Sequence, residues 1–137
     1  MTRSEARVEA FKLVFQITAQ KDSYPEVVSR FEEDNAQMKK NDRKQYKYIV
    51  DAANGVFDNM ADIDELIKNN LTSQWSIERV SKVSLAILRL AVYEIKYKDD
   101  IPNNVSANEA VEIAKVYDID GAASFVNGVL SSIINAD

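Results

Sequence analysis

Apolar residues recur every three or four positions along most of the chain, which is the spacing that buries one face of an α-helix. In the first half, this pattern predicts a helix over residues 4–19, a short helix that begins at Pro25, and a long helix over residues 42–68. The polar stretch 69–74 is typical of a linker. The first half is therefore predicted to be three helices that share one apolar seam.

The second half continues the same pattern in shorter segments. Trp75 and Ile77 anchor a predicted turn of helix. The next helix covers residues 83–95 and ends before Pro102, whose ring cannot continue a helix.

Two further helices are predicted after Pro102 from the residues that cap helix starts. Ser106 and Glu109 stand three residues apart, which is the spacing of a capping box, so a helix is predicted to begin there. Asp120 is placed to cap a last helix over residues 122–134. The pattern gives about seven helices in all.

The segment 83–95 is the predicted core helix of the second half. Its apolar residues surround most of the helix rather than forming one stripe, and a helix of that kind is buried among others. Arg89 lies in its middle, and a buried charge needs a partner. Glu94 points to a different face, so we expect Glu109 to pair with Arg89, which gives both residues a structural role.

Composition also favours helices. The chain has three Gly and two Pro, too few for a turn-rich β-fold. Asn54–Gly55 and Asn127–Gly128 favour hairpin turns when taken alone, but both lie inside helical periods. We therefore place Gly55 and Gly128 in helices, where a missing side chain lets a neighbouring helix or ligand approach the backbone. The predicted fold is one all-α domain over residues 1–137, made of two three-helix bundles over 1–70 and 71–137.

Cysteine and histidine are absent from the sequence, which excludes disulfides, thiol nucleophiles, imidazole bases and most zinc sites. Carboxylates are abundant, but no pair of them falls in a recognisable site, so we expect neither catalysis nor a cofactor. No stretch has the length and apolar character of a signal peptide or a membrane span. These features predict a cytoplasmic protein without membrane association.

The net charge is −5, but the two signs are segregated along the chain. Four cationic side chains lie within residues 1–21 and five within residues 39–48. The acids gather in residues 26–34, 58–65 and 99–120. The two basic segments are therefore the candidates for contact with nucleic acid.

Four short motifs follow one another along the second half. They are Ile87–Glu94 (ILRLAVYE), Ile101–Pro102, Asn108–Lys115 (NEAVEIAK) and Phe125–Leu130 (FVNGVL). An Arg-x-x-x-Arg sequence stands at the N-terminus. In this order and spacing the chain resembles, over essentially its whole length, the NusB family of transcription antitermination factors.

The resemblance implies a non-catalytic adaptor. Members of the family bind the boxA element of nascent ribosomal RNA together with NusE, a small-subunit ribosomal protein. They act in the RNA polymerase antitermination complex, which promotes ribosomal RNA transcription and processing, and they occur as monomers and as homodimers. Two other functions stay open: a protein-interaction module of the same fold with little or no RNA binding, favoured by the net acidity, and an enzyme, which the lack of a site disfavours.

Arg3 and Arg7 match the arginine-rich N-terminus through which the family binds RNA. They stand four residues apart, so on a helix their guanidinium groups are neighbours that can straddle phosphates. On the residues alone, a solvated helix start is the better explanation, whereas the resemblance favours RNA contact.

The basic segment with Lys39, Lys40 and Lys44 is a second candidate RNA surface. Its cations are interleaved with Tyr46 and Tyr48, and a tyrosine ring can stack on a base. Because Tyr46 lies on the apolar stripe, at most Tyr48 is free to do so. A solvated basic face explains the same pattern equally well.

Two aromatic residues, Tyr117 and Phe125, flank the predicted break between the last two helices. The resemblance places both near the RNA path, although aromatic residues at helical spacing more often face the core. The NusE surface of the family maps onto Phe15, Ser84 and Asp120.

Two departures from the family pattern lie close to that surface. The family often has an acidic residue where this chain has Ser84, and often a glycine where it has Asp118. The first removes a carboxylate from the expected NusE contact, and the second changes the turn before the last helix.

Overall fold

The computed structural model describes residues 1–19, 23–72 and 75–136, and all its regular elements are helices. They are α1 (Arg3–Ala19), α2 (Tyr24–Asp34), α3 (Ala36–Asn41), α4 (Arg43–Asp58), α5 (Met60–Asn69), the 3-10 helix η1 (Ile77–Arg79), α6 (Lys82–Tyr97), α7 (Asn103–Tyr117) and α8 (Ala122–Asn135). The predicted all-α fold is confirmed. The end of the predicted linker 69–74 lies outside the described residues.

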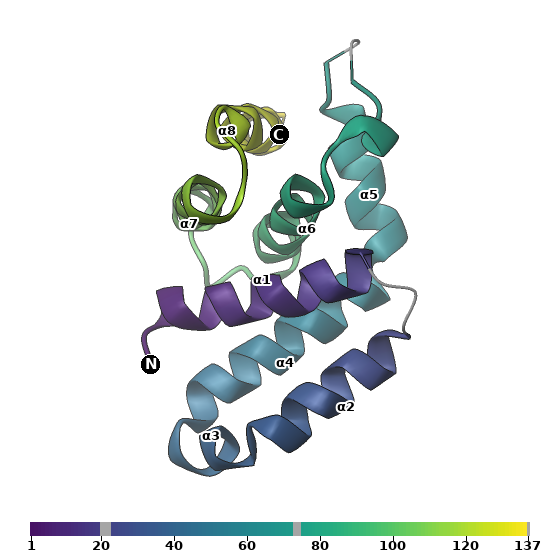
Figure 1. The fold of residues 1–137 in the computed structure, drawn as a ribbon. Helices are drawn as coiled ribbons and strands as arrows, with labels where there is room; N and C mark the ends of the chain where they lie inside the picture. Colours follow the sequence, from purple (N-terminus) through teal and green to yellow (C-terminus); the bar gives the residue numbers. More distant parts are fainter. Residues whose placement is uncertain (20–22, 73–74, 137) are drawn as a thin grey trace.

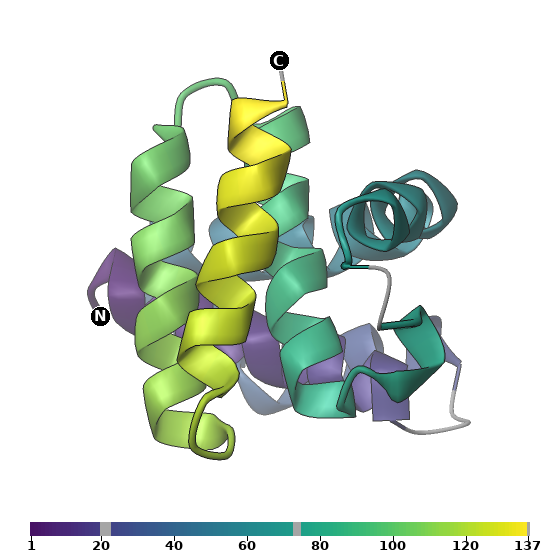
Figure 2. The ribbon, with the colours of Figure 1, turned by 90° about the horizontal axis from the view of Figure 1, so that it is seen from above.

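The helices form two groups that cross each other. In Figure 1, α1, α2 and α4 run across the view, whereas α6, α7 and α8 are seen nearly end-on above α1. Figure 2 shows α6, α7 and α8 side by side. Helix α1 packs against α4 in one group and α6 in the other, and α5 packs against α6. The division into halves at about residue 70 stays a prediction.

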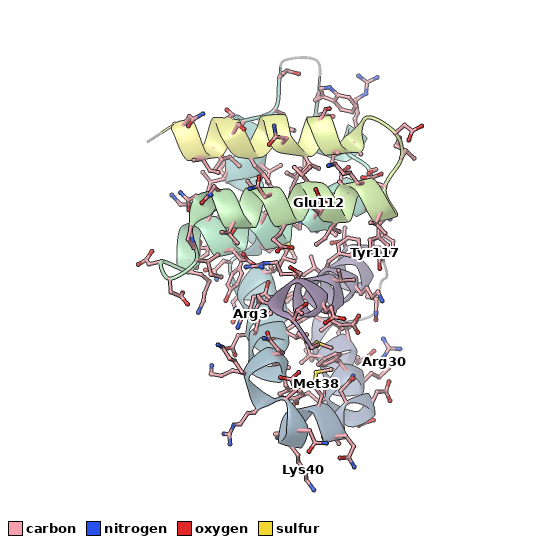
Figure 3. The ribbon with its side chains drawn as sticks, turned by 90° about the vertical axis from the view of Figure 1, so that its left-hand side faces the viewer. Arg3, Arg30, Met38, Lys40, Glu112 and Tyr117 are labelled. Carbon is pink, nitrogen blue, oxygen red and sulfur yellow. The ribbon has the colours of Figure 1, made fainter. Side chains whose placement is uncertain are left out.

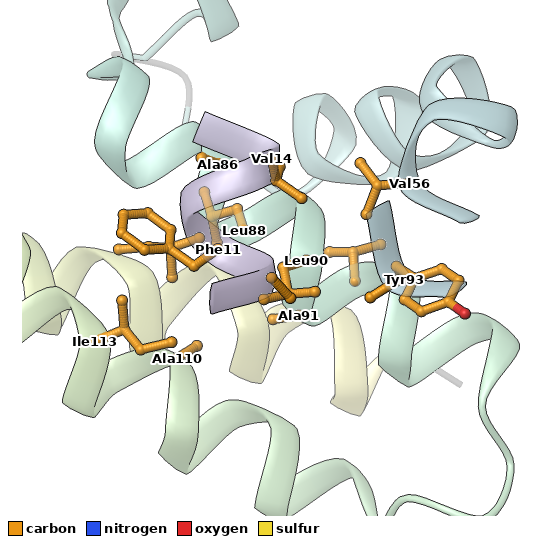
Figure 4. Close-up of a cluster of buried hydrophobic side chains, with 14 of the residues drawn as sticks. Phe11, Val14, Val56, Ala86, Leu88, Leu90, Ala91, Tyr93, Ala110 and Ile113 are labelled. Atoms are coloured by element: carbon orange, nitrogen blue, oxygen red, sulfur yellow. The ribbon is translucent and has the colours of Figure 1, made fainter. Parts of the chain in front are cut away.

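The core helix is α6, as the sequence predicts. Its central residues are buried against α1, α4 and α7, and Leu88 and Val92 are 0% exposed. Figure 4 shows side chains of α1 and α7, including Phe11 and Ile113, gathered around α6. Burying a side chain of this size stabilises the fold by about 1.5–3 kcal/mol. The surfaces of the molecule are therefore held in place by one central helix.

The long helix predicted over residues 42–68 is wrong in one respect, because it is two helices that meet at Asn59. The Asn59 side-chain amide and backbone N–H both donate to the Gly55 carbonyl oxygen, at 2.8 Å and 3.1 Å. The backbone bond is the ordinary bond of a helix, whereas the side-chain amide competes for the same carbonyl oxygen. Asn59 leaves the helical conformation, with φ of −116° and ψ of 19°, and α4 ends there. Asn35 ends α2 through the same pair of bonds to Phe31, and α3 follows where the sequence predicts a polar connection.

Both predicted caps in the second half are also wrong. Helix α7 begins at Asn103, before Ser106, because Pro102 already supplies the extended backbone that precedes a helix. Asp120 makes no side-chain bond to the start of α8. Gly121 takes the position before that helix with φ of 89°, a conformation that favours glycine.

The two helical glycines differ in their surroundings. Gly55 lies where α4 crosses α6, and a Cβ atom added to it would stand 2.0 Å from Cε1 of Tyr93. A Cβ atom added to Gly128 would meet no described heavy atom within 4 Å. The predicted close approach of a neighbouring helix is therefore confirmed at Gly55, whereas no helix in the described part of the chain comes close to Gly128, which lines a surface hollow.

Arg89 does not pair with Glu109, contrary to the sequence-based expectation. Its Nε and Nη2 atoms lie 2.8 Å from Oδ1 and Oδ2 of Asp64 on α5, and its Nη1 donates to the Thr18 hydroxyl at 3.0 Å. Two parallel bonds to one carboxylate make a strong ion pair. Arg89 thus ties α6 to α5 and α1.

Candidate RNA and protein interfaces

Arg7 lies on the inner face of α1 and is 5% exposed. Its Nε donates to both carboxylate oxygens of Glu94, at 2.9 Å and 3.2 Å, and its Nη1 lies 3.6 Å from Oε1 of Glu109. The hydroxyl of Ser4 donates to the same Glu109 oxygen at 2.6 Å. Arg3 and Arg7 are neighbours, with guanidinium carbons 4.4 Å and 5.7 Å from the centre of the Tyr48 ring, but Arg7 is buried and only Arg3 is partly exposed. Their contact with RNA stays a prediction. Glu109 joins α1 to α7.

Glu94 is the centre of this buried network and is 1% exposed. Besides Arg7, the hydroxyl groups of Tyr48 and Ser106 donate to its oxygens. Burial and then the charge of Glu94 raise the pKa of Tyr48, so the tyrosine stays protonated and donates. Because Tyr48 is buried, the prediction that it is free to stack on a base is wrong.

Above this network, a basic groove of about 190 Å³ opens at the surface. It is lined by Arg3, Lys44, Lys47, Tyr48, Asp51, Tyr93, Lys98 and Asp100. The guanidinium carbon of Arg3 lies 4.4 Å from the centre of the Tyr48 ring, a cation–π contact. The fold thus brings together Arg3 and Lys44, two of the predicted RNA residues.

The fold separates Lys39 and Lys40 from that groove. Both are exposed on α3, at the far end of the first helix group. Figure 3 shows Lys40 well away from Arg3. The basic segment of the sequence is therefore two groups of cations in space.

A second surface surrounds the turn between α7 and α8, and we call it the turn surface. It has two hollows. One, of about 380 Å³, is lined by Phe11, Lys12, Phe15, Gln16, Val83 and Tyr117. The other, of about 340 Å³, is lined by Trp75, Arg79, Val80, Ser81, Ser84, Asp118, Ile119, Asp120, Gly121, Ala122 and Phe125. The three predicted NusE residues and both predicted aromatic residues lie in these two hollows.

The turn surface exposes large apolar side chains. Trp75 is 46% exposed, Tyr117 43% and Ile119 77%. The ring of Tyr117 packs on Phe11 with 5.4 Å between centres, and Phe125 packs on Trp75 at 5.2 Å. Grouped exposed apolar residues typically mark a protein interface. Ile119 was not predicted, although an apolar residue between two acids at a helix break is a signal that could have found it.

Ser84 and Asp118, which the resemblance marks as departures, are bonded to each other. The hydroxyl of Ser84, which is buried, donates to Oδ2 of Asp118. Ser81, the N-cap of α6, donates to the same oxygen at 3.5 Å. At this point of the turn surface, the carboxylate is supplied by the turn rather than by α6.

The predicted RNA residues do not form one site. Figure 3 shows Tyr117, at the end of α7, apart from Arg3, at the start of α1. Tyr117 and Phe125 lie with the predicted NusE residues, and the cations of the basic groove lie apart from them. Lys47, Lys98 and Tyr93 complete the groove, and their contribution depends on contacts between distant segments. Among the described residues, no group of three or more carboxylates could hold a metal ion, and no helix is long and apolar enough to cross a membrane.

Proteins of known family match the chain over nearly its full length. The model of the NusB family matches residues 4–135. The transcription antitermination protein NusB of Clostridium novyi (strain NT) is 41% identical over 136 residues, covering 99% of this chain and 100% of that protein. The NusB of Listeria monocytogenes serotype 4a (strain HCC23) is 43% identical over 137 residues, covering 100% and 99%.

Solved structures agree with these sequence matches. A structure of T. maritima NusB has a TM-score of 0.84 at 32% identity and covers 97% of this chain and 90% of that chain. A crystal structure of the antitermination factors NusB and NusE in complex with dsRNA matches with a TM-score of 0.83 at 27% identity, covering 100% of both chains. The chain belongs to the NusB family.

Proposed function

We propose that this protein is a transcription antitermination factor that binds boxA-type RNA of nascent ribosomal transcripts together with a NusE-type ribosomal protein. The observation that carries the proposal is the full-length match to a NusB chain whose structure includes NusE and double-stranded RNA. The protein acts by binding and not by catalysis, in the cytoplasm, as a part of the RNA polymerase antitermination complex.

The two surfaces support separate roles for RNA and protein. The basic groove offers four cations to a polyanion, whereas the turn surface offers exposed apolar side chains to a folded partner. We assign Arg3 and Lys44 to RNA, and Phe15, Ser84 and Asp120 to the NusE side. Tyr117 and Phe125 lie on the turn surface and contact RNA only where RNA runs along the NusE interface.

The burial of Arg7 supports a second candidate function. With Arg7 held by Glu94, Arg3 is the one remaining arginine of the N-terminal pair. The second candidate is a protein-interaction module with little or no RNA binding. Such a module requires only the turn surface and no pair of exposed arginines.

A titration of boxA RNA with and without NusE separates the two functions. We expect the protein to bind boxA RNA at least tenfold more tightly when NusE is present, because the two proteins then share one RNA. An RNA of the same length and scrambled sequence is the control. Binding of NusE without any rise in RNA affinity would establish the second candidate instead.

Substitution of Ile119 tests the turn surface. Ile119 is 77% exposed and lines one of the two hollows of the turn surface. Ile119→Asp places a carboxylate in that hollow, so we expect NusE to bind at least tenfold more weakly. Val116→Asp is the matched control, because Val116 is 73% exposed and lines neither hollow. Calorimetric titration measures both. Equal losses for the two variants would show that NusE does not bind in the hollows.

A further inference from the structure

The basic groove collects cations from three separate parts of the chain. Arg3 begins α1, Lys44 and Lys47 lie on α4, and Lys98 follows α6. The grouping of basic residues along the sequence does not include Lys98, which reaches the groove only through the fold.

The groove has an excess of positive charge. Its four cations face two carboxylates, Asp51 and Asp100. Asp51 accepts from Lys47 at 2.5 Å, but the two side chains are 46% and 73% exposed. Water and salt weaken a pair of that kind, so an incoming anion can replace Asp51 as the partner of Lys47.

Arg3 is held in place by contacts that leave some of its N–H donors available for a ligand. Its Nε donates to Gln45 at 2.8 Å, and its guanidinium group lies over the Tyr48 ring. The Tyr48 hydroxyl is fixed in turn by Glu94. Among the described residues, the two Nη groups of Arg3 have no acceptor, and this pair of donors matches the oxygens of one phosphate.

An exposed aromatic ring stands beside the groove. Tyr93 lines the groove, and its ring stacks with that of Tyr97 at 6.1 Å between centres. Tyr97 is 42% exposed. Cations next to an accessible aromatic face are the combination that binds single-stranded nucleic acid, because the cations neutralise phosphates and the ring stacks on an unpaired base.

We propose that the basic groove binds the phosphate backbone of single-stranded RNA through Arg3, Lys44, Lys47 and Lys98, with Tyr97 stacked on an adjacent base. This inference rests on the proposed function and deepens it, because it says where the RNA lies and which lysines it contacts. Lys39 and Lys40 lie outside this path.

The salt dependence of RNA binding tests the inference. The probe is a single-stranded boxA-type oligonucleotide, titrated in the presence of NusE at several salt concentrations. The affinity falls as salt rises, and each lysine that neutralises a phosphate steepens the slope of log affinity against log salt by about 0.7. We expect Lys47→Ala with Lys98→Ala to reduce the slope by about 1.4 and to weaken binding at low salt at least tenfold.

The matched control is Lys39→Ala with Lys40→Ala. It removes the same two charges from α3, so the overall charge of the protein changes equally while the groove stays intact. We expect its slope to equal that of the unmodified protein. Equal losses in the two double variants would mean that net charge, and not the groove, attracts RNA, and would overturn the inference.

Two further outcomes separate the inference from the proposed function. If the unmodified protein binds the RNA with NusE and the groove variant keeps its slope, the inference is wrong and the function stands. If the unmodified protein does not bind the RNA even with NusE, the proposed function fails and the inference fails with it.

A separate substitution tests the stacking of the Tyr97 ring on an RNA base. Tyr97→Ala should weaken binding about tenfold at an unchanged salt slope, because it removes a ring and no charge. The loss should be absent with a fully paired duplex of the same sequence, whose bases are not free to stack. Unchanged affinity for the single strand would overturn the stacking contact.

Discussion

Replacing Glu94 with glutamine should destabilise the protein by about 3–5 kcal/mol, the typical cost of removing one partner of a buried ion pair. The substitution keeps the size of the side chain but leaves the buried Arg7 guanidinium without its main carboxylate. The remaining carboxylate, Glu109, is 25% exposed and lies 3.6 Å away, so it compensates poorly. Total stabilities of domains are about 5–15 kcal/mol, so this loss is a large fraction.

Urea unfolding followed by circular dichroism measures this loss. Glu112→Gln is the matched control, because Glu112 has an exposed pair with Lys115 at 3.1 Å and should cost less than about 0.5 kcal/mol. The double variant Glu94→Gln with Arg7→Met should lose less stability than the sum of the two single variants. In the double variant, no buried charge is left without its partner. Additive losses would show that Arg7 and Glu94 do not act as a pair.

Replacing Gly55 with alanine should destabilise the protein by about 1–3 kcal/mol, the typical cost of overpacking a core. The new methyl group would lie within 2.0–2.8 Å of three atoms of the Tyr93 ring. That ring is 7% exposed and stacks on Tyr97, so making room requires the packed ring to shift or α4 and α6 to move apart. The better helix propensity of alanine offsets only about 1 kcal/mol of the strain.

The same substitution at Gly128 should have the opposite sign. Gly128→Ala places its methyl group in open space within α8, and we expect a gain of about 0.5–1 kcal/mol. Thermal unfolding of both variants gives the comparison. In a Tyr93→Leu background, Gly55→Ala should lose its cost. A cost that persists there would show that the Tyr93 ring is not the source of the strain.

The helices themselves could be predicted because their apolar spacing is regular. Helix α6 was found this way, and α1 was found with its start displaced by one residue. The end of α4 at Asn59 was missed because the apolar stripe continues across it, whereas the end of α2 near Asn35 was expected and the helix after it, α3, was missed because it has no buried apolar residue. A single side-chain bond to a carbonyl decides those ends, and several asparagines in the sequence are equally able to make it.

The functional surfaces were predictable only in part. Arg7 stands four residues before Phe11 and seven before Val14, so its position on the buried stripe could have been read from the period. Its partner, Glu94, lies in the central buried helix α6, and no spacing rule joins two residues so far apart. For the same reason Lys98 could not be assigned to the basic groove. On the turn surface, in contrast, the family resemblance singled out three residues for NusE and two for RNA, but not Ile119.

The separation of Arg7 and Glu94 along the chain has a consequence for synthesis on the ribosome. The two residues are 87 positions apart. At a usual elongation rate of about 5–20 residues per second, Glu94 is made about 4–17 s after Arg7. Until then, the nascent chain holds an uncompensated arginine within the apolar stripe of α1. We expect α1, although it is made first, to be fixed in place only after α6 has been made, so a translation arrest before α6 leaves α1 open to chaperones and proteases.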